Sequence, residues 1–420
     1  MRILVDTSGY DLLNIGDIAM LQSCVIRLRR LRPDAEIMVV AYSPERLAAC
    51  CPGTSAVGRR HGSQPPLPLL PRGPRLMSEQ AWRIAGPYLS GSSHGAGRPA
   101  RPHTVIQAVR AADLVVASGG SYLTDTWCWH GAGVLSTLSL AQRLGKPTAM
   151  FGQGIGPLRL RLARAQARRV LPKLAVLGLR EYRTGRELAL ALGVPPGILT
   201  VTGDDALELI PGTSVADGDA LGINIRVNGY AGVRPDTAAD AVDLLLRAAS
   251  ALRAPIVALP VSRYARGSDL AAIGALLRGK NSPHDIVLRD LTTPQALVTA
   301  AAGCRAIVTG SYHAAVFGLA QGVPAVCLTK SPYYDAKFAG LRALFPGACF
   351  TVPLGRPDTA ARLSAAIEEA WHLPGTARAA ARDAAGRQRD AGRRAYARFG
   401  EAAGQRRVTI PSRTTRGLIA

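Results

Sequence analysis

The chain is poor in aromatic side chains and lacks the cysteine patterns that bind metals. Phe, Trp and Tyr make up 5% of its 420 residues, which argues against a platform on which nucleic-acid bases stack. The seven cysteines include no C-x-x-C pair, so neither a zinc site nor a disulfide framework is indicated. Small core cysteines in a reducing cytoplasm are the simplest interpretation.

Signals for membranes and for nucleotide cofactors are also missing. No positively charged segment followed by an apolar run precedes the first strand, so no secretion signal is visible. The longest nearly apolar stretch, residues 314–328, is interrupted by glycine and proline and is too short to span a bilayer. The G-x-G-x-x-G and G-x-x-x-x-G-K-[ST] fingerprints are absent as well. We therefore expect a soluble, cytoplasmic protein with no cofactor and no obligatory metal.

Lysine is scarce, yet the chain is strongly basic. Its formal charge of +22 arises from 51 Lys and Arg against 29 Asp and Glu, and only five of the cations are lysines. A GC-rich genome favours arginine, and no nucleic-acid motif accompanies the charge, so we expect no specific nucleic-acid partner. An anionic polymer, peripheral contact with an anionic membrane surface and a phosphorylated substrate all remain open.

Short apolar runs alternate with amphipathic segments, which is the pattern of a doubly wound parallel sheet. At 420 residues the chain exceeds one core, so we predict an α/β protein with two Rossmann-like lobes and a cleft between them. The predicted parts are a first lobe (1–210) with an irregular insertion (52–103), a linker (211–219), a second lobe (220–357), C-terminal helices (358–404) and a basic tail (405–420).

A lone histidine stands at a strand-to-helix turn of the second lobe. The apolar strand 306–309 ends at Gly310, and a helix is expected to open at Ser311, Tyr312 and His313. Helix N-termini carry unpaired N–H groups and partial positive charge, so phosphate or carboxylate is the expected guest. The alternative is a structural His313 that only caps or packs the helix.

Two lysines follow the next predicted strand, 324–328. Lys330, Tyr334 and Lys337 are expected to crowd the turn after it. Ligands of open parallel sheets bind beyond the carboxyl ends of the strands, so His313 and Lys337 are expected in one crevice. Arg226, at the end of the second lobe's first strand, can grip a carboxylate or phosphate at two points.

Other candidate substrate-binding residues also lie at strand ends or helix starts. They are Asn14, Gly16, Asp17, Gly119, Gly120, Gln153, Gly154, Arg180, Asp204 and Asn224. Asp17 is placed to cap the first helix, and Gly16 permits close approach of a ligand. The segment 152–157 is expected as a glycine-rich loop between a strand and a helix. Each position also fits a plain structural role, such as a helix cap or a strand exit.

Together these motifs resemble the polysaccharide pyruvyl transferase family over roughly residues 1–345. The resemblance rests on Asn14-Ile15-Gly16-Asp17, Gly119-Gly120, Gly152-Gln153-Gly154-Ile155-Gly156-Pro157, Arg180-Glu181, Gly203-Asp204, His313 with Gly318 and Pro324, and Tyr334 to Leu341. It implies a GT-B-like fold and transfer of pyruvate from phosphoenolpyruvate to sugar hydroxyls. Family members often carry arginine two residues before the histidine, where this chain has Ser311. Arg226, Lys330 or Lys337 could supply that charge instead.

The implied reaction needs an acid that protonates the methylene carbon of phosphoenolpyruvate and cations that hold its two anionic groups. His313, with an ordinary pKa of about 6.5, suits the acid role, and Arg226 and Lys337 suit the anion clamp. The acceptor would be a sugar, glycolipid or polysaccharide. Three alternatives stay open: a nucleotide-sugar glycosyltransferase, a non-catalytic glycan-binding relative, and a nucleic-acid binder supported by charge alone.

Overall fold

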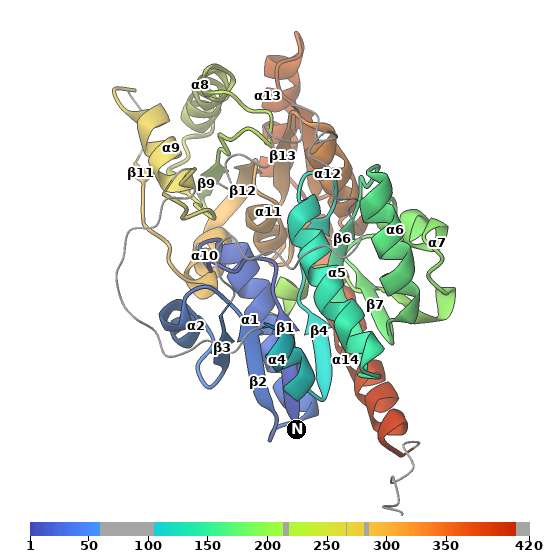
Figure 1. Cartoon of the computed structure of the whole chain (residues 1–420). Helices are drawn as coiled ribbons and strands as arrows, with labels where there is room; N and C mark the ends of the chain where they lie inside the picture. The colour runs from blue at the N-terminus through green and yellow to red at the C-terminus, as the bar shows by residue number, and fades with distance from the viewer. Residues whose placement is uncertain (59–104, 213–217, 266, 281–284, 409–420) are drawn as a thin grey trace, which may run out of the picture.

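The computed structural model describes residues 1–58, 105–212, 218–265, 267–280 and 285–408. Within these ranges the chain forms two parallel β-sheets flanked by helices, and the two lobes lie against each other (Figure 1). None of the helices described is long and apolar enough to cross a bilayer. The predicted α/β architecture of two Rossmann-like lobes is confirmed.

The first lobe has the strand order β3-β2-β1-β4-β6-β7-β8, with β5 paired to β6. Its strands are β1 (Arg2–Asp6), β2 (Glu36–Val40), β3 (Ser55–Val57), β4 (Leu114–Ala117), β5 (Gly120–Leu123), β6 (Thr148–Ile155), β7 (Val176–Leu179) and β8 (Leu199–Val201). Its helices are α1 (Ile15–Leu31), α2 (Pro44–Cys50), α4 (Val105–Ala111), α5 (Cys128–Arg143), α6 (Arg161–Val170) and α7 (Gly185–Ala191). The order reverses between β1 and β4, which is the switch point where such sheets bind ligands.

The second lobe has the strand order β11-β10-β9-β12-β13-β14. Its strands are β9 (Ala220–Asn224), β10 (Ile256–Ala258), β11 (Ile286–Val287), β12 (Cys304–Thr309), β13 (Ala325–Thr329) and β14 (Cys349–Pro353). Its helices are α8 (Pro235–Leu252), α9 (Asp269–Leu277), α10 (Pro294–Ala302), α11 (Tyr312–Leu319), α12 (Pro332–Leu344) and α13 (Thr359–Trp371). The switch point lies between β9 and β12, so Arg226 and Ser311 follow the two strands that flank it.

The beginning of α1 joins the two lobes. The Ile15 amide donates to the Val261 carbonyl at 2.9 Å, and the Arg263 amide donates to the Leu13 carbonyl at 2.8 Å. Ile15 and Met20 are buried in the same apolar core as α10 and α11 of the second lobe. Because this junction combines main-chain hydrogen bonds with an apolar core, it fixes the first turn of α1 against the second lobe.

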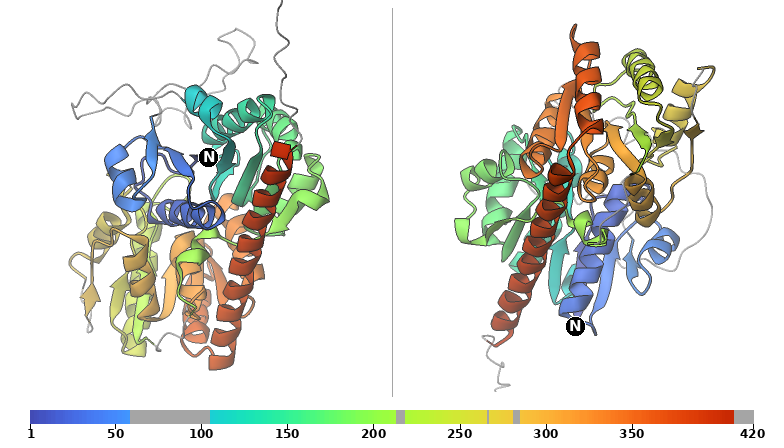
Figure 2. Two further views of the ribbon diagram at one scale, coloured as in Figure 1. Left: turned by 90° about the horizontal axis from the view of Figure 1, so that it is seen from below. Right: turned by 180° about the vertical axis from the view of Figure 1, so that it is seen from behind.

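The long C-terminal helix α14 (Gly375–Val408) returns from the second lobe to the first (Figure 2). The preceding helix, α13, packs on the second lobe instead, and the chain turns between them at His372, Leu373 and Pro374. The Tyr396 ring of α14 stacks on Phe151 of β6, with ring centroids 3.6 Å apart. The C-terminal helix therefore couples both lobes.

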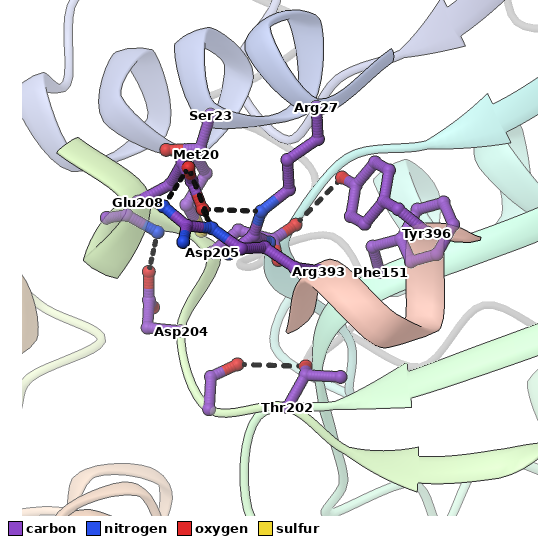
Figure 3. A network of polar contacts seen from close by, with 12 residues as sticks. Met20, Ser23, Arg27, Phe151, Thr202, Asp204, Asp205, Glu208, Arg393 and Tyr396 are labelled. Atoms are coloured by element: carbon purple, nitrogen blue, oxygen red, sulfur yellow. Dashed lines mark hydrogen bonds and ion pairs between the residues drawn. The ribbon is translucent and has the colours of Figure 1, made fainter. Parts of the chain in front are cut away.

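Buried ion pairs hold α14, α1 and the 3₁₀ helix η3 (Asp205–Leu209) together (Figure 3). Arg27 of α1 donates to Asp205 at 2.6 Å and to Glu208 at 3.1 Å. Glu208 also accepts from Arg30 and from Arg393 of α14, whose Nη2 lies 2.9 Å from Oε1. Burial alone would raise the pKa of Glu208, but these arginines lower it to about 2. The network fixes the chain just after Asp204, which belongs to the candidate site.

Several predicted boundaries are wrong. The insertion 52–103 was expected to be irregular throughout, but β3 lies inside it because Ser55–Val57 pairs with β2; residues 59–103 lie outside the described residues. The helix α14 continues to Val408, into the predicted tail, and residues 409–420 are again outside. Of the predicted linker, residues 213–217 are not described.

Two predicted loops are regular structure. Residues 152–155 belong to β6, because they pair with β5 and β7, so this segment is not a glycine-rich loop. The expected turn that holds Tyr334 and Lys337 is the start of α12, where the Ser331 hydroxyl caps the helix and Pro332 sits in its first turn.

Candidate active site

The site is built where the carboxyl ends of the strands in both lobes meet the first turn of α1. Asn14, not the predicted Asp17, caps α1: its Oδ1 accepts from the Gly16 amide at 2.9 Å and from the Asp17 amide at 3.3 Å. Asp17 instead accepts a hydrogen bond from the Ser8 hydroxyl at 3.0 Å. Asp17 is the third residue of the helix, three positions after Asn14, and so lies too far into the first turn to act as the cap.

Gly16 and His313 lie directly against each other across the lobe boundary. A Cβ atom added to Gly16 would lie 1.9 Å from His313 Nδ1. Glycine is therefore required here for close packing with the protein's own histidine, whereas the sequence predicted close approach of a ligand. The α1 turn thereby fixes one edge of the imidazole ring.

The other edge of the His313 ring faces a buried carboxylate. Asp204 Oδ2 lies 3.6 Å from His313 Nε2 and 3.0 Å from Arg180 Nε, and all three side chains are buried. Burial alone would raise the pKa of Asp204, but Arg180 and His313 reverse that effect and lower it. The sequence predicts an anionic ligand at the start of α11, but the anion that His313 faces is the side chain of Asp204. A ligand at this helix start would have to bind beside Asp204.

The charge state of His313 follows from these neighbours. Burial lowers its pKa, and the Arg180 guanidinium lowers it further, while Asp204 opposes both effects. The ring is 7% exposed, and Nε2 makes no hydrogen bond to any described residue. An anionic ligand placed beside this ring would favour its protonated form.

Arg180 is held from several sides at the end of β7. Its Nη1 donates to the Ser121 hydroxyl at 3.1 Å, and its Nη2 lies 2.9 Å from Met20 Sδ. Its guanidinium lies 4.8 Å from the centre of the Tyr312 ring. Arg180 therefore connects β5, α1 and α11, and supplies a buried positive charge next to His313.

Lys337 sits on α12 inside a cage of tyrosines. Its Nζ lies 4.9, 5.3 and 5.7 Å from the ring centres of Tyr312, Tyr333 and Tyr334, respectively. Burial, together with the charges of Arg180 and Arg226, lowers its pKa to about 7. Arg180 and Lys337 lie over the same Tyr312 ring, 4.8 and 4.9 Å from its centre. No hydrogen bond, ion pair or ring contact among the described residues joins Lys337 to His313, so a crevice shared by these two residues stays a prediction.

Arg226 follows β9 by two residues, because that strand ends at Asn224. Its Nη1 lies 3.9 Å from Asp269 Oδ2, and its guanidinium lies 5.7 Å from the Tyr230 ring centre. Its buried Nε makes no hydrogen bond to a described residue. Burial opposes its charge, but the groups around it raise its pKa, so it stays protonated. Arg226 and Tyr334 line a small pocket whose other residues are Ile225, Ala231, Val233, Gly310, Leu328 and Leu354.

Asn224 has a structural role that the sequence did not reveal. Its amide donates to Asp269 Oδ2 at 3.0 Å and to the Leu259 carbonyl at 2.9 Å. The amides of Val261 and Ser262 donate to the same Asp269 oxygen. Asn224 therefore fixes the counter-ion of Arg226.

Other predicted residues have structural partners or lie apart. The Gln153 amide donates to Ser118, Tyr122 and Phe151, so it bridges strand ends. A Cβ on Gly119, Gly120 or Gly154 would meet Met20, Tyr122 or Ser121 within 3.0 Å, so these glycines allow close packing. Ser311 precedes α11 without a side-chain capping bond. Lys330 donates to Thr237 of α8 at 3.3 Å, and no described contact links it to His313.

Sequence reasoning missed several side chains at the site. Tyr333 accepts from Lys337 at 3.4 Å, and Trp127 makes an edge contact with Tyr230 across the two lobes, with centroids 5.3 Å apart. Ser121 holds Arg180, and Asp269 pairs with Arg226. One signal in the sequence could have pointed to this region: Trp127 and Trp129 lie close together in a chain that is poor in aromatic residues.

The facing lobes and the site between them have the GT-B-like architecture of glycosyltransferases and sugar-nucleotide epimerases. The calicheamicin glycosyltransferase CalG4 shares 14% identity with a TM-score of 0.52, over 98% of this chain and 99% of that one. A putative UDP-N-acetylglucosamine 2-epimerase from Listeria monocytogenes shares 11% identity with a TM-score of 0.57, over 96% and 97%. The UDP-GlcNAc 2-epimerase from Neisseria meningitidis, bound to UDP-GlcNAc, shares 12% with a TM-score of 0.53, over 98% and 100%. These likenesses show the fold alone.

The family is shown by sequence. The model of the polysaccharide pyruvyl transferase family matches residues 14–332, which is most of the chain and includes both lobes. The chain therefore belongs to the polysaccharide pyruvyl transferase family and is a transferase. A comparison with curated protein sequences finds no match.

Proposed function

We propose that this enzyme transfers the pyruvyl group of phosphoenolpyruvate to hydroxyls of a sugar or polysaccharide precursor, forming a cyclic ketal. The observation that carries the proposal is that buried Arg180 pairs with Asp204, which faces His313, and lies over the same Tyr312 ring as Lys337, in a member of the pyruvyl transferase family. Phosphoenolpyruvate carries a carboxylate and a phosphate, and both need positive charge nearby. Arg226 follows β9 at the switch point of the second lobe, Arg180 follows β7 of the first lobe, and Lys337 lies on α12.

Arg226 and Lys337 are the proposed clamp for the donor. Arg226 stays charged, and its Nε lacks a protein partner, so it can donate to a carboxylate or phosphate oxygen. Lys337 has a pKa of about 7, and an anion beside it would favour the ammonium form. These two side chains, together with Arg180, replace the charge that family members often carry at the position of Ser311.

His313 is the proposed general acid. It donates a proton to the methylene carbon of the donor, which makes C2 electrophilic, and the first sugar hydroxyl attacks C2. Phosphate leaves with the proton of the first hydroxyl, and a second hydroxyl then attacks C2, closes the ketal and returns its proton to His313. Asp204 stabilises the protonated imidazole, and Gly16 with Asp204 holds the ring in one orientation.

The test is release of inorganic phosphate from phosphoenolpyruvate in the presence of candidate sugar acceptors. His313→Ala should remain folded and lower turnover by roughly 10²–10⁴-fold, while donor affinity changes less. Arg226→Ala should mainly weaken donor affinity, because an anion then loses its buried partner. His372→Ala is the matched control, since His372 is exposed and pairs only with Glu368 at 3.1 Å. Near-normal turnover of folded His313→Ala would refute the assignment.

Nucleotide-sugar glycosyl transfer is the second candidate function, because this chain has the same fold as the glycosyltransferase CalG4. The two reactions release different products, inorganic phosphate or a nucleoside diphosphate. Calorimetric binding of phosphoenolpyruvate without binding of UDP-sugars supports pyruvyl transfer. The reverse result, with release of UDP, would replace it by glycosyl transfer.

A further inference from the structure

The outer face of α6 carries an unusual concentration of exposed arginines. Arg161, Arg168 and Arg169 project from one side of this helix, and all three are exposed. The opposite side, with Ala167 and Val170, is buried against the lobe. Four further exposed cations lie close in sequence: Arg159 before the helix, and Lys173, Arg183 and Arg186 after it. Both α6 and α7 lie on the same outer edge of the first lobe in every view (Figures 1 and 2).

No ion pair among the described residues neutralises these cations, although the Asp125 carboxylate accepts from the backbone amides of Arg159 and Leu160. None of the exposed basic side chains between residues 159 and 186 forms an ion pair with another described residue. The one carboxylate in that stretch, Glu181, is buried and accepts from the amides of the next turn. By contrast, Arg393 of α14, which also contains many arginines, pairs with Glu208. The high arginine content of the whole chain accounts for the number of cations but not for this lack of partners.

Apolar side chains stand among the arginines. Leu160 and Leu162 are 49% and 64% exposed, and Tyr182 on the neighbouring loop is 46% exposed. The first two adjoin Arg161 in sequence, so exposed apolar groups stand beside a cation at the start of α6. A soluble anionic polymer or a nucleic acid would need only the charge. A phospholipid bilayer satisfies both features, because headgroups pair with arginines while leucines enter the acyl boundary.

We propose that this face, defined by Arg159 to Leu162 with Arg168 and Arg169, docks peripherally on a bilayer rich in anionic phospholipids. It begins at the end of β6, on the edge of the first sheet that carries Arg180 and the α1 turn. Docking would therefore hold the first-lobe side of the active site close to the headgroup layer. The inference rests on exposure and charge, and is independent of the reaction.

The test is co-sedimentation of the full chain with vesicles of phosphatidylcholine alone or with added phosphatidylglycerol. The wild type should bind only the anionic vesicles, and added salt should weaken binding. The triple variant Arg161→Gln, Arg168→Gln and Arg169→Gln should bind roughly 10²-fold more weakly, since each cation contributes about fivefold. The matched control removes the same charge from the second lobe, as Arg247→Gln, Arg278→Gln and Arg289→Gln, all exposed and unpaired among the described residues.

A second variant separates a membrane from a soluble polymer. Leu160→Ser with Leu162→Ser keeps every charge, and should lower vesicle binding about tenfold, because these side chains no longer enter the bilayer. Heparin retention of this variant should equal that of the wild type. Equal loss in the control variant, no preference for anionic vesicles, or full vesicle binding without the leucines would each overturn the proposal. Vesicle binding does not depend on the reaction, so it is expected even if the protein does not use phosphoenolpyruvate.

Discussion

Replacement of Gly16 by alanine tests how strictly His313 must be positioned. The new Cβ would lie 1.9 Å from His313 Nδ1, about 1.6 Å short of an ordinary contact of roughly 3.5 Å. The ring cannot simply shift away, because Asp204 lies 3.6 Å from its other nitrogen and the surroundings are buried. Either His313 turns out of its position or α1 moves away from the second lobe.

Two opposing effects on stability can be weighed. Alanine stabilises a helix interior by at most about 1 kcal/mol relative to glycine. Overpacking of a buried contact costs roughly 1–3 kcal/mol. The free energy of unfolding should therefore fall by up to about 2 kcal/mol. Turnover should fall more clearly, by about 10²-fold, because a displacement of about 1 Å of a catalytic group is enough for that loss.

The control is Gly386→Ala in α14, where nothing lies within 4 Å of the added Cβ. This change should raise stability by about 0.5–1 kcal/mol and leave turnover unchanged. Unfolding in urea and phosphate release from phosphoenolpyruvate would be measured for both variants and the wild type. If Gly16→Ala behaves like Gly386→Ala, with raised stability and normal turnover, then His313 is not held by Gly16 and the positioning argument is wrong.

Three further predictions concern charge. Because the pKa of Lys337 is about 7, phosphoenolpyruvate affinity should fall by up to about tenfold per pH unit above 7, and Lys337→Arg should flatten that profile. Calorimetry between pH 6 and 9 measures the affinity, and a wild-type profile that is already flat would contradict the clamp role. Arg27→Met leaves buried Asp205 without its 2.6 Å partner and should lower the free energy of unfolding in urea by roughly 3–5 kcal/mol. Adding Asp205→Asn should restore part of that loss, and purely additive effects of the two changes would refute the pairing. Asp204→Asn removes the group that raises the pKa of His313, so the loss of turnover with rising pH should begin at lower pH; an unshifted profile would exclude that coupling.

Much of the architecture was accessible from local patterns. The alternation of apolar strands and helices reports burial over a few residues, so it predicted two doubly wound lobes, which the two parallel sheets confirm. The strand-end rule also singles out Arg180, Asp204, Arg226 and His313 as candidate site residues, and it predicts one crevice for His313 and Lys337. Where strands and turns share glycine, as in residues 152–155, the same rule failed, because sheet pairing rather than composition decides between them.

The working geometry depended on the tertiary structure. No local pattern brings Asp204 beside His313, or Gly16 against the same ring, because these contacts join different lobes. The tyrosine cage of Lys337 and its lowered pKa arise from burial and from charges on other elements. The sequence by itself determined which elements form and which residues stand at their ends, since propensity and periodicity act over a few residues. Only the tertiary structure decided which of those residues meet and which are charged, because burial and Coulomb interactions depend on distance in space.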